Sequence, residues 1–234
     1  MHYISRLSAC KFSLKALLAV FFVFLVFSGF RADAQLHKDP WANYGGGSSD
    51  SGYGISLSAE YDAPAADLAT TFKPAPALNL GVVRSFGDFT FNATLGYHVY
   101  SPKQAVFYYD DGAGGQGTIV YQNYPVYAFY VGAVYNLQLS DAVKLYAGLN
   151  WGLYYTHYAY DAEDQFSSNS IDLNEEELYV APKIGLTYLL GGQISLGIEA
   201  KYNFFTPEGN SDTSPDVGTV YKSYAAGVVL TYRF

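Results

Sequence analysis

The chain is poor in cysteine, in charge and in long apolar runs. Its 234 residues include one cysteine, Cys10, and only 15% are Asp, Glu, Lys or Arg. A single cysteine excludes a disulfide framework and a cysteine-built metal site. The one apolar run, Ala16 to Phe27, is shorter than the roughly 20 residues that a membrane-spanning helix needs. A disulfide-stapled fold and a helical membrane protein are therefore both disfavoured.

Aromatic residues and glycine are abundant instead. The sequence has 24 Tyr, 16 Phe and 23 Gly, and half of all residues are hydrophobic. Tyr and Phe favour strands, and a chain of this length forms a single all-β domain without difficulty. A mean hydropathy of only +0.03 does not exclude a membrane protein, because a strand of a membrane barrel shows only half of its residues to lipid.

The N-terminus has the features of an export signal. Three basic residues precede the apolar run, and Ala32-Asp33-Ala34 follows it as an A-x-A cleavage site before Gln35. We therefore expect residues 1–34 to be a cleaved signal peptide, which removes Cys10. Residues 35–50 end in a glycine run and are expected to form a flexible periplasmic lead-in.

The exported chain is acidic. Without its first 34 residues it keeps 9 of the 13 basic and 20 of the 21 acidic residues, a formal charge of −11. Nucleic-acid binding is disfavoured at this charge, since it depends on basic surfaces.

Strict alternation of side chains begins near residue 51 and continues to the end of the chain. In the last stretch, Ser223 to Phe234, one face carries bulky apolar residues with aromatic residues at both ends. Seven earlier segments alternate in the same way: 53–61, 78–85, 89–99, 127–136, 143–153, 178–188 and 194–203. Eight strands are therefore predicted.

The connections between these strands alternate in length. Short turns are expected at Gly87-Asp88, at 140–142 and at Gly191-Gly192; long polar loops are expected at 62–74, 101–124, 157–177 and 206–222. This pattern predicts an eight-stranded antiparallel transmembrane up-and-down β-barrel over residues 51–234. The short turns and both termini would be periplasmic, and the long loops extracellular.

The bulky face of each strand is expected to point outward. Eight strands enclose only enough space for side chains to fill, and a face of Phe, Tyr, Trp and Leu on every strand is too large for it. The face of Gly, Ser, Thr, Ala and Asn fits. A soluble, lipocalin-like barrel fails on this volume argument, because only lipid accepts such an apolar exterior.

Charged residues occur on the predicted inward face. Glu60, Lys183, Glu199 and Lys201 are expected at similar depth, with Lys144 and Arg233 closer to the periplasm. Enclosed charges are costly unless they are paired, so a lumen ion-pair network that plugs the barrel is predicted. A small gated pore remains the alternative.

The register of the network depends on the turn at Gly191-Gly192. Leu190 and Ile194 are both outward, so this connection needs an odd number of residues or a bulge. Of the two registers left, we expect Lys183 opposite Glu199, because Lys183 opposite Lys201 would place like charges together. Lys201 would then reach Glu60 or solvent.

A lipid-modifying or proteolytic barrel enzyme is a further alternative. His157 opens a long loop with Asp161, Asp164 and Ser167 nearby, and His98 lies near the end of its strand. No His-x-Ser pair occurs, so no catalytic residue is assigned. The acidic residues between Asp161 and Glu177 lack the spacing of an EF-hand, and neither a metal nor a cofactor is predicted.

Residues 51–234 resemble the small outer-membrane barrel superfamily that includes the OmpA transmembrane domain and OmpX. The resemblance rests on the strand pattern and on the terminal sequence TYRF, with no diagnostic internal motif. It implies that Tyr232 and Phe234 form a signal read by the barrel assembly machinery. It also implies a monomer in the cell outer membrane, surrounded by lipid and lipopolysaccharide, with a structural or surface-interaction role and an unknown extracellular partner of its loops.

Overall fold

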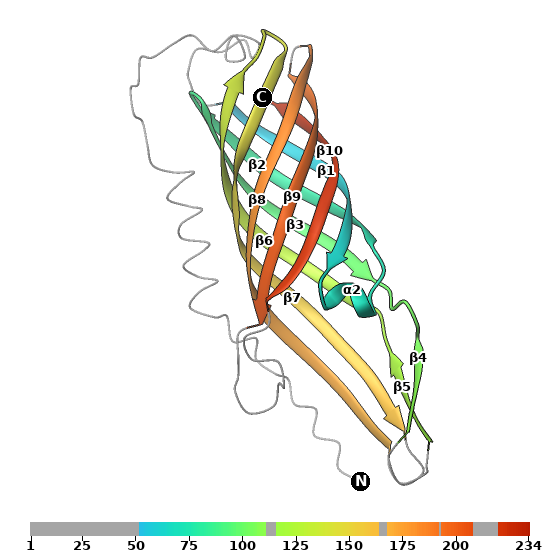
Figure 1. Cartoon of the computed structure of the whole chain (residues 1–234). Coiled ribbons are helices and arrows are strands. Elements are labelled where there is room, and N and C mark those ends of the chain that lie inside the picture. Colours follow the sequence, from blue (N-terminus) through green and yellow to red (C-terminus); the bar gives the residue numbers. More distant parts are fainter. Residues whose placement is uncertain (1–51, 111–115, 164–167, 192, 208–219) are drawn as a thin grey trace, which may run out of the picture. The chain divides into compact units, whose positions relative to one another are not determined.

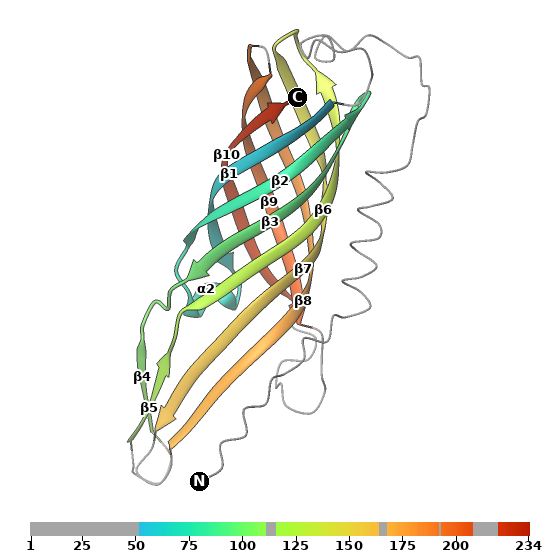
Figure 2. The ribbon, with the colours of Figure 1, turned by 180° about the vertical axis from the view of Figure 1, so that it is seen from behind.

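A computed structural model describes residues 52–110, 116–163, 168–191, 193–207 and 220–234, without the side chains of Gln116, Tyr158, Asn169, Ile171 and Pro207. Eight long strands form a barrel (Figures 1 and 2). They are β1 (Gly52–Ala65), β2 (Ala75–Phe86), β3 (Phe89–Tyr100), β6 (Tyr124–Gln138), β7 (Val143–Glu163), β8 (Ser168–Gly191), β9 (Ile194–Pro207) and β10 (Tyr221–Arg233). A hairpin of β4 (Val106–Asp110) and β5 (Gln116–Tyr121) and the short helix α2 (Leu68–Thr71) complete the described elements.

Each barrel strand pairs with its two neighbours, and the first strand closes on the last. The ring runs β1-β2-β3-β6-β7-β8-β9-β10 with every pairing antiparallel. Closure is made by twelve residue pairs between β1 and β10, from Gly54 opposite Arg233 to Ala65 opposite Lys222. A closed ladder leaves no open sheet edge. The predicted eight-stranded antiparallel barrel is thus confirmed.

The predicted assignment of faces is confirmed on all eight strands. Outward leucines and isoleucines are largely uncovered, for example Leu95 at 60% and Ile198 at 61% exposure. Aromatic side chains flank this aliphatic band. Tyr97 and Tyr127 lie paired at the end with the long connections, their ring centroids 5.0 Å apart, and Phe89 and Tyr135 at the other end, 5.4 Å apart.

The short turns lie together at one end of the barrel, next to the C-terminal end of β10 (Figure 1). Gly87 lies in the two-residue turn between Phe86 and Phe89, the last pair of β2 and β3. Its φ of +54° is left-handed, a conformation that favours glycine. Between β8 and β9 the register shifts between Leu189 and Gly191. The bulge that the sequence requires here is confirmed.

The predicted register between β8 and β9 is wrong. Lys183 lies opposite Lys201, not opposite Glu199. The outward pairs Ile184–Ala200 and Leu186–Ile198 fix this register. Like charges are tolerated because the two long side chains diverge to carboxylates on different strands, as described below.

The prediction of a loop over 157–177 is also wrong. β7 continues to Glu163 and β8 begins at Ser168, so their ladder extends well past the barrel. β5 pairs with this extension at Thr118–Tyr121. The extension and the β4–β5 hairpin form a four-stranded sheet in the order β4-β5-β7-β8, which we call the protruding sheet (Figures 1 and 2). In this extension β7 and β8 are held by their backbone hydrogen bonds, because the outward apolar pattern has already ended.

The expectations for the signal peptide and for residues 35–50 fall outside the described residues. Among the described residues, no helix is long and apolar enough to cross a membrane.

Candidate functional site: the filled lumen

Four of the predicted lumen residues form two ion pairs in the middle of the barrel. Lys183 Nζ lies 3.3 Å from Glu199 Oε2, and Lys201 Nζ lies 2.7 Å from Glu60 Oε2. All four side chains are at most 9% exposed. We call these residues the ion-pair cluster. Pairing offsets the cost of removing each charge from water.

Hydrogen bonds tie both pairs to the wall. Tyr146 donates to Glu199 Oε2 at 2.9 Å, and its ring lies over Gly185, where any Cβ would collide with it. Lys183 Nζ also lies 3.5 Å from Asn92 Oδ1. These contacts tie the Lys183–Glu199 pair to two further strands, β7 through Tyr146 and β3 through Asn92.

The second pair has its own polar support. Ser58 Oγ donates to Glu60 Oε1 at 3.3 Å and accepts from Asn79 Nδ2 at 2.9 Å. The ammonium of Lys201 lies 5.4 Å from the centroid of the Tyr130 ring, within the range of a cation–π contact.

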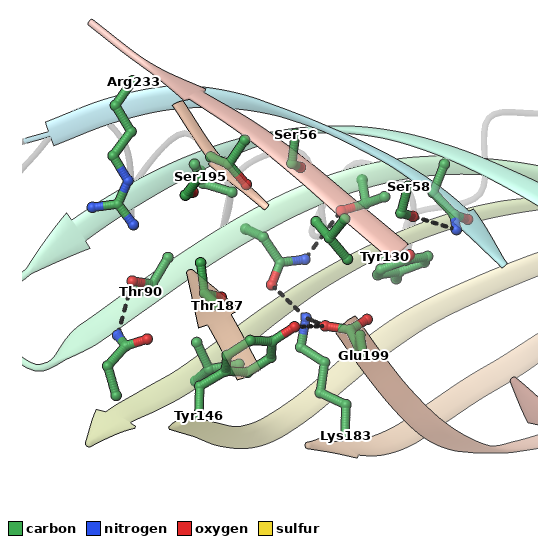
Figure 3. A pocket seen from close by; sticks show the side chains of 18 residues that line it. Ser56, Ser58, Thr90, Tyr130, Tyr146, Lys183, Thr187, Ser195, Glu199 and Arg233 are labelled. Atoms are coloured by element: carbon green, nitrogen blue, oxygen red, sulfur yellow. Dashed lines mark hydrogen bonds and ion pairs between the residues drawn. The ribbon is translucent and has the colours of Figure 1, made fainter. Parts of the chain in front are cut away.

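The other two predicted lumen residues lie closer to the short turns. Lys144 is the second residue of β7 and is buried, and Arg233 ends β10. Arg233 lines a cavity of about 100 Å³ whose opposite end is lined by Lys183, Glu199 and Tyr146 (Figure 3). The lumen on this side of the ion-pair cluster is therefore polar and partly open.

Aromatic rings fill the lumen on the other side of the cluster. Tyr154 and Tyr179 stack with ring centroids 4.3 Å apart, and Tyr130 and Phe205 pack against them at 5.4 and 5.3 Å. All four are nearly or fully buried. The sequence pattern predicts mainly small side chains on this face, and the filling by aromatic rings was not predicted.

The connection between β1 and β2 closes the mouth. Phe72 follows α2 and stacks on Tyr124 at 5.3 Å, and Tyr100 stacks on the same ring at 6.1 Å. Backbone bonds between Lys73 and Ser101 and between Lys103 and Thr71, both 2.8 Å, anchor this segment to the residues after β3. We call the whole set the aromatic plug: Phe72, Tyr100, Tyr124, Tyr130, Tyr154, Tyr179 and Phe205.

Buried polar groups join the plug to the wall. Asp62 accepts from Tyr100 Oη at 2.6 Å and from Asn203 Nδ2 at 2.9 Å, and Asn203 Oδ1 accepts from Tyr179 Oη at 3.0 Å. Glu177 Oε1 accepts from Tyr124 Oη at 2.8 Å and from Thr156 Oγ1 at 3.0 Å. Asp62 and Glu177 were predicted to lie in loops. Each continues the inward phase of its strand, which was the available signal.

The two histidines considered for catalysis have different surroundings. His98 is buried, and its ring packs edge-on against Tyr100 at 4.6 Å. His157 lies on the protruding sheet, with Nδ1 3.1 Å from Asn174 Oδ1 and 3.4 Å from Asp172 Oδ1. Asp164 and Ser167, the neighbours considered for His157, are outside the described residues. Among the described residues no group of three or more His, Cys, Asp or Glu could hold a metal ion.

The two residues of the proposed assembly signal lie on the outward face. Tyr232 and Phe234 are 47% and 65% exposed, with ring centroids 6.4 Å apart. Phe234 N donates to the Tyr53 carbonyl at 3.0 Å. Recognition of these rings by assembly machinery stays a prediction.

Fold and lumen define the chain as a closed eight-stranded β-barrel filled by an aromatic plug and an ion-pair cluster. No protein-family model and no curated protein matches it. Solved structures similar to it include Neisserial surface protein A (14% identity, TM-score 0.42, covering 80% of this chain and 99% of that one). A second is Ail of Yersinia pestis, with 16% identity and a TM-score of 0.40, covering 79% of this chain and 97% of that one. A third is a major outer membrane protein of Thermus thermophilus, with 12% identity and a TM-score of 0.45, covering 80% of this chain and 100% of that one. The function has to be inferred from this chain's own residues.

Proposed function

We propose that the protein is an outer-membrane barrel with a closed lumen, whose role is structural or lies in surface interaction through the protruding sheet. The outward aliphatic band flanked by aromatic residues carries this proposal. Such a surface matches a lipid bilayer, in which the aliphatic band faces the lipid tails and the aromatic rings lie at the two membrane–water interfaces. The short turns would then face the periplasm and the protruding sheet the exterior.

The filled lumen supports a closed barrel over a pore. The aromatic plug fills the half of the lumen towards the long connections, and three of its hydroxyl groups, those of Tyr100, Tyr179 and Tyr124, donate to Asp62, Asn203 and Glu177. A conducting path would have to displace several buried rings at once.

The protruding sheet supports interaction with a cationic partner. Its described residues include no Lys or Arg, but six carboxylates: Asp110, Asp161, Glu163, Asp172, Glu175 and Glu176. Tyr108 is 73% exposed, and the rings of Phe107, Tyr121 and Tyr160 form a chain of contacts at 5.3 and 5.9 Å. Complementary charge guides such partners to each other.

Two measurements test this proposal. The refolded mature chain in a planar bilayer should show no conductance; regular openings would contradict the plug and favour the pore. The lipid A of cells should have the same mass spectrum with and without the protein, and a modified lipid A would establish the enzyme alternative instead.

The interaction role is tested separately with a defined polycation. The refolded barrel should bind immobilised polylysine, and replacing the six carboxylates with their amides should abolish binding. The matched control replaces three exposed carboxylates outside the sheet, Asp67, Asp88 and Asp141. Equal binding by both variants would contradict a role for the protruding sheet.

A further inference from the structure

The cavity between the ion-pair cluster and the short turns has the composition of an anion site. Its volume of about 100 Å³ leaves space for about three water-sized groups, since a water takes up roughly 30 Å³ in the liquid. Figure 3 shows Arg233 at one end, Lys183 and Glu199 at the other, and Ser195 between them.

Ser195 gives the first evidence for a ligand. Its side chain is only 2% exposed, and its Oγ has no hydrogen-bond partner among the described residues. A buried hydroxyl without a partner is costly. A group that accepts its hydrogen bond inside the cavity would remove this cost.

A row of hydroxyl groups extends from Ser195 across three neighbouring strands. Ser195 on β9 lies opposite Thr231 on β10, and Thr231 lies opposite Ser56 on β1. All three line the cavity, and Arg233 follows Thr231 by two residues on the same face. Closure of the barrel between β1 and β10 is what brings the row together.

The lining of the cavity contains more cations than carboxylates. It contains two cations, Lys183 and Arg233, and one carboxylate, Glu199, which already lies 3.3 Å from Lys183. A guanidinium carries five N–H groups in a fixed fork, so it can donate to a wall group and to a ligand at once. These side chains therefore offer more to an anion than to a cation.

We propose that this cavity binds a small inorganic anion of the size of chloride, held by the hydroxyl groups of Ser195, Thr231 and Ser56 together with Arg233. Water would satisfy the hydroxyl groups as well, but it would gain less from the cationic side chains of the lining than an anion does. An anion suits both features. This site is independent of the protruding sheet and of the aromatic plug.

Chloride binding to the refolded barrel in zwitterionic micelles tests the proposal. Chloride-35 NMR lines should broaden in the presence of the protein, and excess bromide should reverse the broadening. The thermal midpoint should rise when chloride replaces gluconate at constant ionic strength, by about 2 to 4 °C at a chloride concentration roughly five times the dissociation constant. No broadening and no shift would overturn the proposal and leave water as the occupant.

Variants locate the site. Arg233→Gln should lose the chloride-dependent broadening and shift, and Ser195→Ala should weaken both. The matched control is Arg84→Gln, because Arg84 does not line the cavity and lies over the rings of Tyr53 and Phe86 at 4.8 and 4.2 Å. If Arg233→Gln does not refold, Ser195→Ala carries the test. A response to chloride that Ser195→Ala leaves unchanged, or that Arg84→Gln removes, would overturn the assignment.

Discussion

Lys183 and Lys201 face each other across the β8–β9 ladder, yet each is neutralised by a carboxylate on a different strand. Lys183 reaches Glu199, two residues before Lys201 on β9, and Lys201 reaches Glu60 on β1. The two ion pairs thus link β8, β9 and β1. Because each ammonium group turns to its own carboxylate, the two lysine side chains point apart. The cluster has to be considered as a unit of four charges.

Glu199→Ala should destabilise the barrel clearly. It removes the partner of Lys183 and leaves that ammonium facing Lys201. Breaking a buried pair from one side costs about 3 to 5 kcal/mol, and less where water reaches the site. Because Glu199 lines a polar cavity, we expect a loss of stability at the lower end of this range. The free energy of unfolding in urea, followed by gel mobility without boiling, measures the loss.

The double variant Glu199→Ala/Lys183→Ala is the control for this pair. It removes both charges and should recover part of the loss. If the two single losses simply add, Lys183 and Glu199 are not coupled, and the ion pair contributes nothing to stability.

The sequence predicted the barrel well because the period of a strand is short and repeated. Every face was assigned correctly from alternation, and Leu190 and Ile194 even required the bulge that the structure has. The Lys183–Glu199 ion pair was predicted, and Lys201 reaches Glu60, one of the two partners expected for it. The register was predicted wrongly, because repulsion between lysines was judged at the Cα positions and these side chains are long enough to diverge.

The aromatic plug and the protruding sheet could not be predicted from the same signal. The protruding sheet lies beyond the point where outward apolar residues stop, and the predicted strands were ended there. Asp62 continues the inward phase of β1 one step beyond its predicted end, whereas Tyr179 and Asn203 already lie inside the predicted segments 178–188 and 194–203. Alternation assigns a residue to the inward face, but it does not say which inward residues of different strands contact one another. Only the structure shows those contacts.

Gly185→Ala should be more harmful than the same change at Gly197. A Cβ at Gly185 would overlap the Tyr146 ring and lie 2.6 Å from the Ile198 carbonyl, whereas at Gly197 the nearest atom is 3.0 Å away. Overpacking of this kind costs about 1 to 3 kcal/mol. Both glycines are inward-facing on adjacent strands, which makes Gly197→Ala the matched control. Equal unfolding free energies for the two variants would show that Tyr146 can move aside.

Asp62→Ala should loosen the aromatic plug. Asp62 is 2% exposed and accepts hydrogen bonds from Tyr100 and Asn203, so its loss leaves two buried donors without an acceptor. The expected cost is about 1.5 to 3 kcal/mol for each hydrogen bond to the charged group. Asp67→Ala, five residues further on in the connection after β1 but exposed and without a side-chain cap bond, should change stability by no more than about 0.5 kcal/mol. An equal effect of the two changes would mean that solvent replaces the lost acceptor.

Removal of the outer part of the β7–β8 hairpin should leave the barrel intact but expose the β4–β5 hairpin to protease. Replacing residues 159–172 with a tight Asn-Gly turn keeps the pairs up to Tyr158 opposite Leu173. The barrel pairs of β7 with β6 and of β8 with β9 all lie outside the replaced residues, so the variant should still migrate differently before and after boiling.

The β4–β5 hairpin should lose its support in this variant. β5 pairs with β7 only at Thr118 to Tyr121, opposite Tyr160 to Glu163. Without that partner, β4 and β5 are an isolated two-stranded hairpin, which is marginal in water. Chymotrypsin should then cut near Phe107, Tyr108 and Tyr109 in the variant and much more slowly in the full chain. Equal resistance of both proteins would show that the hairpin is held by contacts other than its pairing with β7.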